Sequence, residues 1–165
     1  MSTNSMALDV SRLCFTRRTW VPASVEDAYR LISDVSTIEL WSPTASRVSY
    51  DDGDGPRRGA WFSGQNARDG RTWTTRSQVS EAVPGQSFGF VVGGLEDGIV
   101  EWRWTFTPSG IGCEVRQHWA LRRYDAVLGQ NSGDLTDLQE YMIESVEQTL
   151  IALSRWFTES DPPKR

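Results

Sequence analysis

Alternation of apolar and polar residues is the main pattern over most of the chain. Between residues 46 and 123, short alternating runs are separated by glycine-rich turns, which is typical of antiparallel strands joined by hairpins. This pattern predicts six strands, at 46–51, 59–67, 71–83, 86–93, 99–107 and 111–122. An earlier alternating run at 12–21 predicts one more strand near the start. The sequence therefore predicts seven strands.

Helical spacing appears in three places. Ser24 begins the sequence S-V-E-D, a capping box that opens a helix with Ala28, Tyr29 and Ile32 on one face. A second capping box, from Ser36 to Glu39, predicts a short helix that ends before Pro43, since the residue preceding a proline resists the helical region. Residues 134–158 carry apolar side chains at three-or-four spacing and predict one long amphipathic helix.

The order of these elements predicts an α+β architecture. A curved antiparallel sheet needs one face covered, and the long C-terminal helix is the only predicted element able to cover it. A sheet wrapped around one helix, with two short helices after its first strand, leaves a space for a ligand between sheet and helix. We predict a single domain over residues 1–165, with a loose lead-in at 1–10 and a tail at 159–165.

Hairpin geometry predicts which strand residues are partners. We expect two-residue turns at 69–70, 84–85 and 109–110. Such a turn fixes the register of its two strands, and cross-strand partners share a face. The predicted pairs are Asn66–Trp73 and Phe62–Ser77, then Ser77–Val92 and Val79–Phe90, then Trp104–Val115 and Trp102–Gln117.

One face of the predicted sheet is aromatic and aliphatic, with a few neutral polar groups. We take this concave face as the ligand-contacting surface and add one aromatic and one thioether side chain from the helical segments. The candidate contacts are Phe62, Asn66, Trp73, Thr75, Ser77, Phe90, Trp102, Trp104 and Gln117, with Trp41 and Met142.

Two interpretations of this face remain open. Core packing alone explains its apolar members. It explains Asn66, Thr75 and Ser77 less well, because buried polar groups without partners are costly. A hydrated or ligand-filled cavity accounts for them, and so does an open mouth at which they meet water.

Composition narrows the classes of partner. The chain has 165 residues with eight Trp, and aromatic rings line sites for flat apolar ligands. The net charge is −5 and no basic patch is visible, so we expect no nucleic-acid partner. No apolar run reaches about 18 residues and no signal segment is seen, so we expect a cytoplasmic protein without stable membrane insertion.

The reactive side chains argue against several kinds of site. The single histidine, His118, excludes a metal site of several imidazoles and argues against a Ser-His-Asp triad; it faces outward, opposite Glu101. Cys14 and Cys113 fall on opposite faces, which argues against a disulfide. We expect no metal and no cofactor. Arg17 has the parity of the inward residues and could bind an anionic group, or it could lie in solvent at the strand end.

Several stretches resemble a known family. They are Val-Pro-Ala-Ser at 21–24, E-D-A-Y-R-L-I-S-D at 26–34, Trp-Ser-Pro at 41–43, G-A-W-F-S-G-Q-N at 59–66, Trp73, V-S-E-A-V-P-G-Q-S-F-G-F at 79–90 and Trp-Arg-Trp at 102–104. Over residues 12–158 the chain resembles the polyketide cyclase/dehydrase and lipid-transport (SRPBCC) family of the START/Bet v 1-like superfamily. The resemblance implies a helix-grip fold with a deep hydrophobic cavity, in agreement with the architecture derived above.

The resemblance implies more than one function for such a cavity. The first is binding of a hydrophobic or aromatic small molecule, lipid or polyketide-like. The alternative is a cofactor-independent aromatase/cyclase or dehydratase that folds a polyketone by shape, with a polar group assisting enolisation. Arg17, Asn66, Gln117 and the hydroxyl of Tyr29 are the candidates for that group. A third interpretation is a protein-contact module, and a sheet surface carrying Trp61 could support a homodimer.

Overall fold

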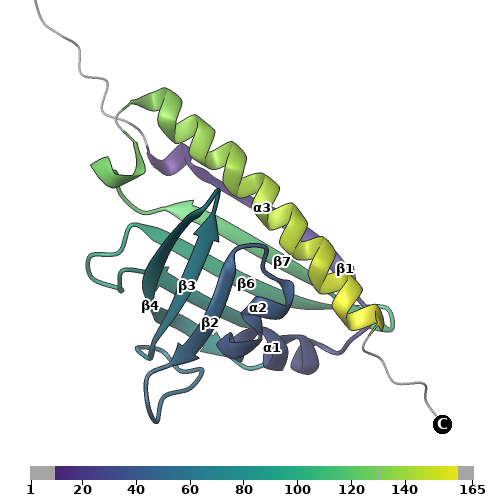
Figure 1. Ribbon diagram of the computed structural model, residues 1–165. Coiled ribbons are helices and arrows are strands. Elements are labelled where there is room, and N and C mark those ends of the chain that lie inside the picture. Colours follow the sequence, from purple (N-terminus) through teal and green to yellow (C-terminus); the bar gives the residue numbers. More distant parts are fainter. Residues whose placement is uncertain (1–9, 130, 160–165) are drawn as a thin grey trace, which may run out of the picture.

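The alternating segments form one seven-stranded antiparallel sheet, and the long amphipathic segment forms a helix across it (Figure 1). This computed structural model describes residues 10–129 and 131–159. The strand order is β1-β7-β6-β5-β4-β3-β2. The strands are β1 (Cys14–Val21), β2 (Ala45–Tyr50), β3 (Trp61–Arg68), β4 (Arg71–Val83), β5 (Ser87–Val92), β6 (Val100–Ser109) and β7 (Gly112–Leu121). The helices are α1 (Val25–Ser33), α2 (Ile38–Trp41) and α3 (Ser132–Glu159), with 3-10 turns at Val10–Arg12, Val35–Thr37 and Ala126–Leu128.

The predicted α+β helix-grip fold is therefore confirmed, with strand and helix bounds within about two residues of those expected. The predicted lead-in at 1–10 and tail at 159–165 lie, apart from Val10 and Glu159, outside the described residues. None of the helices within 10–129 and 131–159 is long and apolar enough to cross a membrane.

Both short helices form after β1, but only the first is capped as predicted. Ser24 Oγ accepts a hydrogen bond from the backbone N–H of Asp27 at 3.1 Å. The second predicted capping box is wrong. Asp34 caps the preceding 3-10 turn instead, because its carboxylate accepts from both the backbone N–H and the hydroxyl of Ser36. The α2 helix then begins after Thr37, whose side chain makes no capping bond.

The β3–β4 hairpin forms in the predicted register. Asn66 pairs with Trp73 and Phe62 with Ser77. The turn residues Asp69 and Gly70 both have positive φ, at 50° and 76°. An Asp-Gly turn takes up this conformation readily, and its twist matches that of the flanking strands.

The β4–β5 hairpin reaches the predicted register by a different route. Its turn is one residue longer than expected, because Val83 pairs with Ser87. A register shift between Val79 and Glu81 inserts one compensating residue into β4. The two offsets cancel, so that Val79 still pairs with Phe90 as predicted.

The predicted register of β6 and β7 is wrong by two residues. Ser109 pairs with Gly112, so the turn residues are Gly110 and Ile111, and Trp104 faces Gln117. Gly110 has a φ of 59°, a conformation that glycine adopts without strain. Of the two turn residues only Gly110 has positive φ, which is the pattern of a type II′ turn, and glycine is the preferred first residue of that turn. A shift of two residues keeps every side chain on its predicted face.

The outer face of β6 and β7 is polar, as predicted. Arg103 pairs with Glu101 at 3.3 Å, and Arg116 pairs with Glu114 at 2.5 Å. His118 lies opposite Arg103 rather than opposite Glu101, because of the register correction. Exposed ion pairs of this kind contribute little to the free energy of folding. The main effect of these charged side chains is therefore to make the outer face of the sheet hydrophilic.

Candidate functional site

A cavity of about 300 Å³ lies between the concave face of the sheet and the middle of α3. Residues of α1 and α2 close one end of it. All eleven residues that the sequence nominated as ligand contacts lie on its wall: Trp41, Phe62, Asn66, Trp73, Thr75, Ser77, Phe90, Trp102, Trp104, Gln117 and Met142. The cavity wall is thus built from residues of six strands, β2 to β7, together with α1, α2, α3 and the 3-10 turn at Ala126–Leu128.

Aromatic rings shape the deep part of the cavity. Trp104 is 1% exposed and pairs across the sheet with Phe88. Trp41 stands edge-on to Trp104, with ring centroids 5.5 Å apart and planes at 82°. Phe62 and Phe90 make a second edge-to-face pair at 5.0 Å. Edge-to-face packing of large rings leaves few alternative rotamers, so this end of the cavity has a defined shape.

The tip of the β3–β4 hairpin forms the mouth of the cavity. Trp73 lines the cavity but is 45% exposed. Asn66 Nδ2 donates a hydrogen bond to Thr75 Oγ1 at 3.0 Å. The guanidinium of Arg68 lies over the ring of Tyr141 in α3, 3.3 Å from its centroid. This cation–π contact joins the hairpin tip to the helix, and in Figure 1 the β3–β4 hairpin points toward α3.

Arg17 does not lie on the cavity wall, which corrects its nomination as a catalytic group. It is on the helix side of β1, as its parity indicated. Its Nε donates to Glu147 Oε1 at 3.3 Å and its Nη1 donates to the carbonyl of Thr16 at 3.0 Å. The guanidinium also lies 5.5 Å from the ring centroid of Phe15. Arg17, on the edge strand β1, thus pairs with Glu147 of α3 and is not among the residues that line the cavity.

Tyr29 is likewise outside the cavity wall. It is buried in α1, edge-on to Phe106 with ring centroids 6.1 Å apart. Burial raises the pKa of its hydroxyl, since desolvation disfavours the phenolate. Its position at the packed end of the sheet corrects its nomination as a group that assists enolisation.

The cavity wall is almost free of titratable groups. Among the described residues that line it, Tyr141 is the only one with a titratable side chain. Cys113 is buried elsewhere in the core, and burial raises the pKa of its thiol. Within 10–129 and 131–159, no group of three His, Cys, Asp or Glu side chains could hold a metal ion. The wall can therefore solvate a neutral ligand far better than a charged one.

Most of the helical part of the wall was not predicted from the sequence. Met142 was the one residue expected there from α3, whereas Tyr141, Ser145, Val146 and Thr149 also line the cavity. A spacing of four residues relates Tyr141 to Ser145 to Thr149, so this stripe was visible in the sequence. Ser and Thr are polar, so an amphipathic pattern by itself assigns them to the solvent face of a helix and not to a cavity wall.

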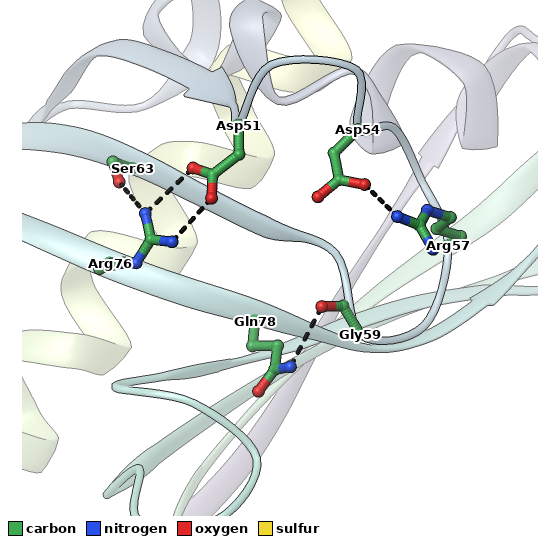
Figure 2. A network of polar contacts seen from close by, with 7 residues as sticks. All are labelled: Asp51, Asp54, Arg57, Gly59, Ser63, Arg76 and Gln78. Atoms are coloured by element: carbon green, nitrogen blue, oxygen red, sulfur yellow. Dashed lines mark hydrogen bonds and ion pairs between the residues drawn. The ribbon is translucent and has the colours of Figure 1, made fainter.

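A polar network supports the cavity wall from the outer face of the sheet (Figure 2). Arg76 donates two hydrogen bonds to the carboxylate of Asp51, at 2.7 and 3.0 Å, and one to Ser63 Oγ at 3.2 Å. The hydrogen bonds from Arg76 hold the pKa of Asp51 below its ordinary value. Gln78 Nε2 donates to the carbonyl of Gly59 at 3.1 Å. These contacts connect the β2–β3 loop to β4. They stabilise the positions of β3 and β4, the two strands whose hairpin tip forms the mouth of the cavity.

Known structures of the same architecture support this geometry. The Polyketide_cyc-like protein Cgl2372 from Corynebacterium glutamicum is 28% identical, with a TM-score of 0.65 over 93% of this chain and 98% of that one. The di-domain ARO/CYC StfQ from the steffimycin biosynthetic pathway is 20% identical, with a TM-score of 0.68 over 89% of this chain and 51% of that one. The major latex-like protein 151 from Panax ginseng is 8% identical, with a TM-score of 0.64 over 87% and 96%. The last two likenesses show the fold alone.

The family comparison is more specific. A comparison with curated proteins finds no significant match. The model of one protein family, described as polyketide cyclase / dehydrase and lipid transport, matches residues 12–155. Since that match covers most of the chain, this protein belongs to the polyketide cyclase / dehydrase and lipid transport family.

Proposed function

We propose that the protein binds a neutral hydrophobic or aromatic small molecule, lipid or polyketide-like, in the cavity between the sheet and α3. The observation that carries the proposal is the wall itself: about 300 Å³ of space lined by aromatic and aliphatic side chains with few polar groups. Small-molecule sites are typically concave, mostly apolar and of this size or larger. The mouth at Trp73 offers a route of entry, because this indole is half exposed while the deep end is closed.

Cyclisation or dehydration of a polyketide is the alternative function of the same cavity. It is supported by the description of the family and by the likeness to aromatase/cyclase domains such as StfQ. With Tyr141 the only titratable side chain on the described wall, such a reaction would depend mainly on the shape in which the substrate is held. Asn66 and Gln117 are the polar groups that could polarise a carbonyl there.

Native mass spectrometry of the purified protein, followed by denaturing extraction, tests the binding proposal. We expect either a co-purified apolar molecule or, after its removal, stoichiometric binding of an apolar probe such as 2-naphthol. Met142→Trp should block binding because it fills the cavity from α3. Ile151→Trp is the matched control, since Ile151 is 60% exposed on the same helix and lies off the cavity wall. An empty wild-type protein that binds no apolar probe would refute the proposal.

The same variants separate binding from turnover. A synthetic poly-β-ketone thioester cyclises slowly by itself, so the product distribution with and without protein is the readout. If the protein is a cyclase, it changes the ring pattern, and Met142→Trp abolishes that change while Ile151→Trp does not. A bound thioester whose products match those of the free compound would refute the cyclase alternative and leave the binding proposal standing.

A further inference from the structure

The side-chain oxygen of Gln117, a residue on the cavity wall, is buried without a hydrogen-bond partner among the described residues. The residue is 7% exposed and lines the cavity. Among the described residues, none makes a hydrogen bond with its Oε1. The terminal torsion of a glutamine is soft, so either atom of the amide can turn toward the cavity. Gln117 thus offers one acceptor and two donors to whatever occupies the space.

The neighbours of Gln117 are already engaged. Its cross-strand partner Arg17 donates to Glu147 and to a backbone carbonyl. On the facing helix, the hydroxyl of Thr149 donates to the carbonyl of Ser145 at 2.8 Å. Neither of these two side chains makes a hydrogen bond with the amide of Gln117.

A glutamine in this place is not explained by packing. An unpartnered buried amide is costly, and an apolar side chain of the same shape would pack equally well without that cost. The other cross-strand partner of Gln117 is the deeply buried Trp104, which continues the row to Phe88. The amide accordingly sits beside the aromatic end of the cavity, where the ring of a flat ligand would lie.

We propose that Gln117 determines specificity, by recognising a hydroxyl group on the buried part of an aromatic or enolised ligand. This inference rests on the proposed binding function. A phenol or enol hydroxyl both donates and accepts, so it satisfies the amide whichever way the amide is turned. A ketone accepts only, and an ionised group would find no counter-charge on the described wall. The ligand class is thus a neutral, hydroxylated, flat apolar molecule.

A pair of probes of equal shape tests this inference. 2-Naphthol and 2-methylnaphthalene differ only in a hydroxyl against a methyl group, and calorimetry gives the dissociation constant of each. The readout is the ratio of the two dissociation constants. Comparing this ratio between protein variants cancels the difference in hydrophobicity between the two probes. Gln117→Met keeps the length and shape of the side chain. It should raise the dissociation constant of 2-naphthol about tenfold relative to that of 2-methylnaphthalene.

The control is the same substitution at an exposed site. Gln148 is exposed on α3 and lies off the cavity wall, so Gln148→Met should leave the ratio at its wild-type value. If both probes bind and Gln117→Met leaves the ratio unchanged, the role of Gln117 is refuted while cavity binding stands. If neither probe binds the wild type, the binding proposal fails and this inference fails with it.

A second measurement needs no substitution. In the ¹⁵N-labelled wild-type protein, the side-chain amide resonances of Gln117 should move when 2-naphthol is added and move much less with 2-methylnaphthalene. Equal responses to the two bound probes would overturn the inference even if Gln117→Met failed to fold.

Discussion

Replacing Trp104 by alanine should destabilise the protein much more than replacing Trp73, although both indoles line the same cavity. Trp104 is 1% exposed and packs between the sheet and Trp41, whereas Trp73 is 45% exposed at the mouth. The comparison is matched, because the two side chains are chemically identical and lie on the same face of one sheet. The difference between the two variants shows which tryptophan stabilises the fold and which is available to contact a ligand.

The magnitude follows from the buried area. A tryptophan side chain buries roughly 200 Å² when fully enclosed. At about 25 cal/mol per Å², this gives about 5 kcal/mol for Trp104, in line with a cost of about 3–5 kcal/mol for truncating large core side chains. For Trp73 roughly half of that area is involved, and truncation opens no closed void. Since areas referred to an extended chain are upper bounds, we expect about 1–2 kcal/mol for Trp73.

Urea denaturation of the two variants measures this difference. With a slope of about 2 kcal/mol per M, a gap of about 3 kcal/mol separates the two midpoints by about 1.5 M. Circular dichroism of the native baselines controls for a change of fold. If the midpoints differed by less than about 0.3 M, the assignment of Trp104 to the core and Trp73 to the mouth would be wrong.

Three further predictions concern single groups. Asp51→Asn removes a carboxylate whose pKa is lowered by its hydrogen bonds with Arg76, so the wild type should be more stable than the variant above the ordinary pKa of aspartate. This difference in stability should disappear as the pH falls through the lowered pKa. Urea midpoints of both proteins from about pH 7 to about pH 2 measure the difference, and a value that does not change with pH would contradict the prediction. A thiol reagent should label exposed Cys14 in the native protein but buried Cys113 only after denaturation, because burial also raises the pKa of that thiol; two native labels would disprove this arrangement. Gly98→Ala should lower the melting temperature, since a Cβ there would meet a valine side chain and two backbone carbonyl oxygens; an unchanged melting temperature would show that the β5–β6 loop yields freely.

The faces predicted from the sequence for residues of β6 and β7 are correct, although the predicted register of these two strands was wrong. Side chains alternate along a strand, so parity is a local property of the chain. In β6–β7 the error was two residues, and a shift of two returns each side chain to the same face. This is why Trp104 and Gln117 were both placed on the cavity side although neither was paired correctly.

The alternation, the glycine-bearing turns and the long amphipathic segment were sufficient by themselves to determine seven strands, one covering helix and nine strand residues of the cavity wall. Partners distant in the chain were decided only by the tertiary structure. Arg17 donates a hydrogen bond to Glu147, 130 residues away in the chain, and its side chain lies outside the cavity wall. The side-chain oxygen of Gln117 is left without a hydrogen-bond partner among the described residues, although the register sets it beside Arg17 and Trp104. Local patterns fix which way a side chain points, but what it meets depends on how the helix lies over the sheet.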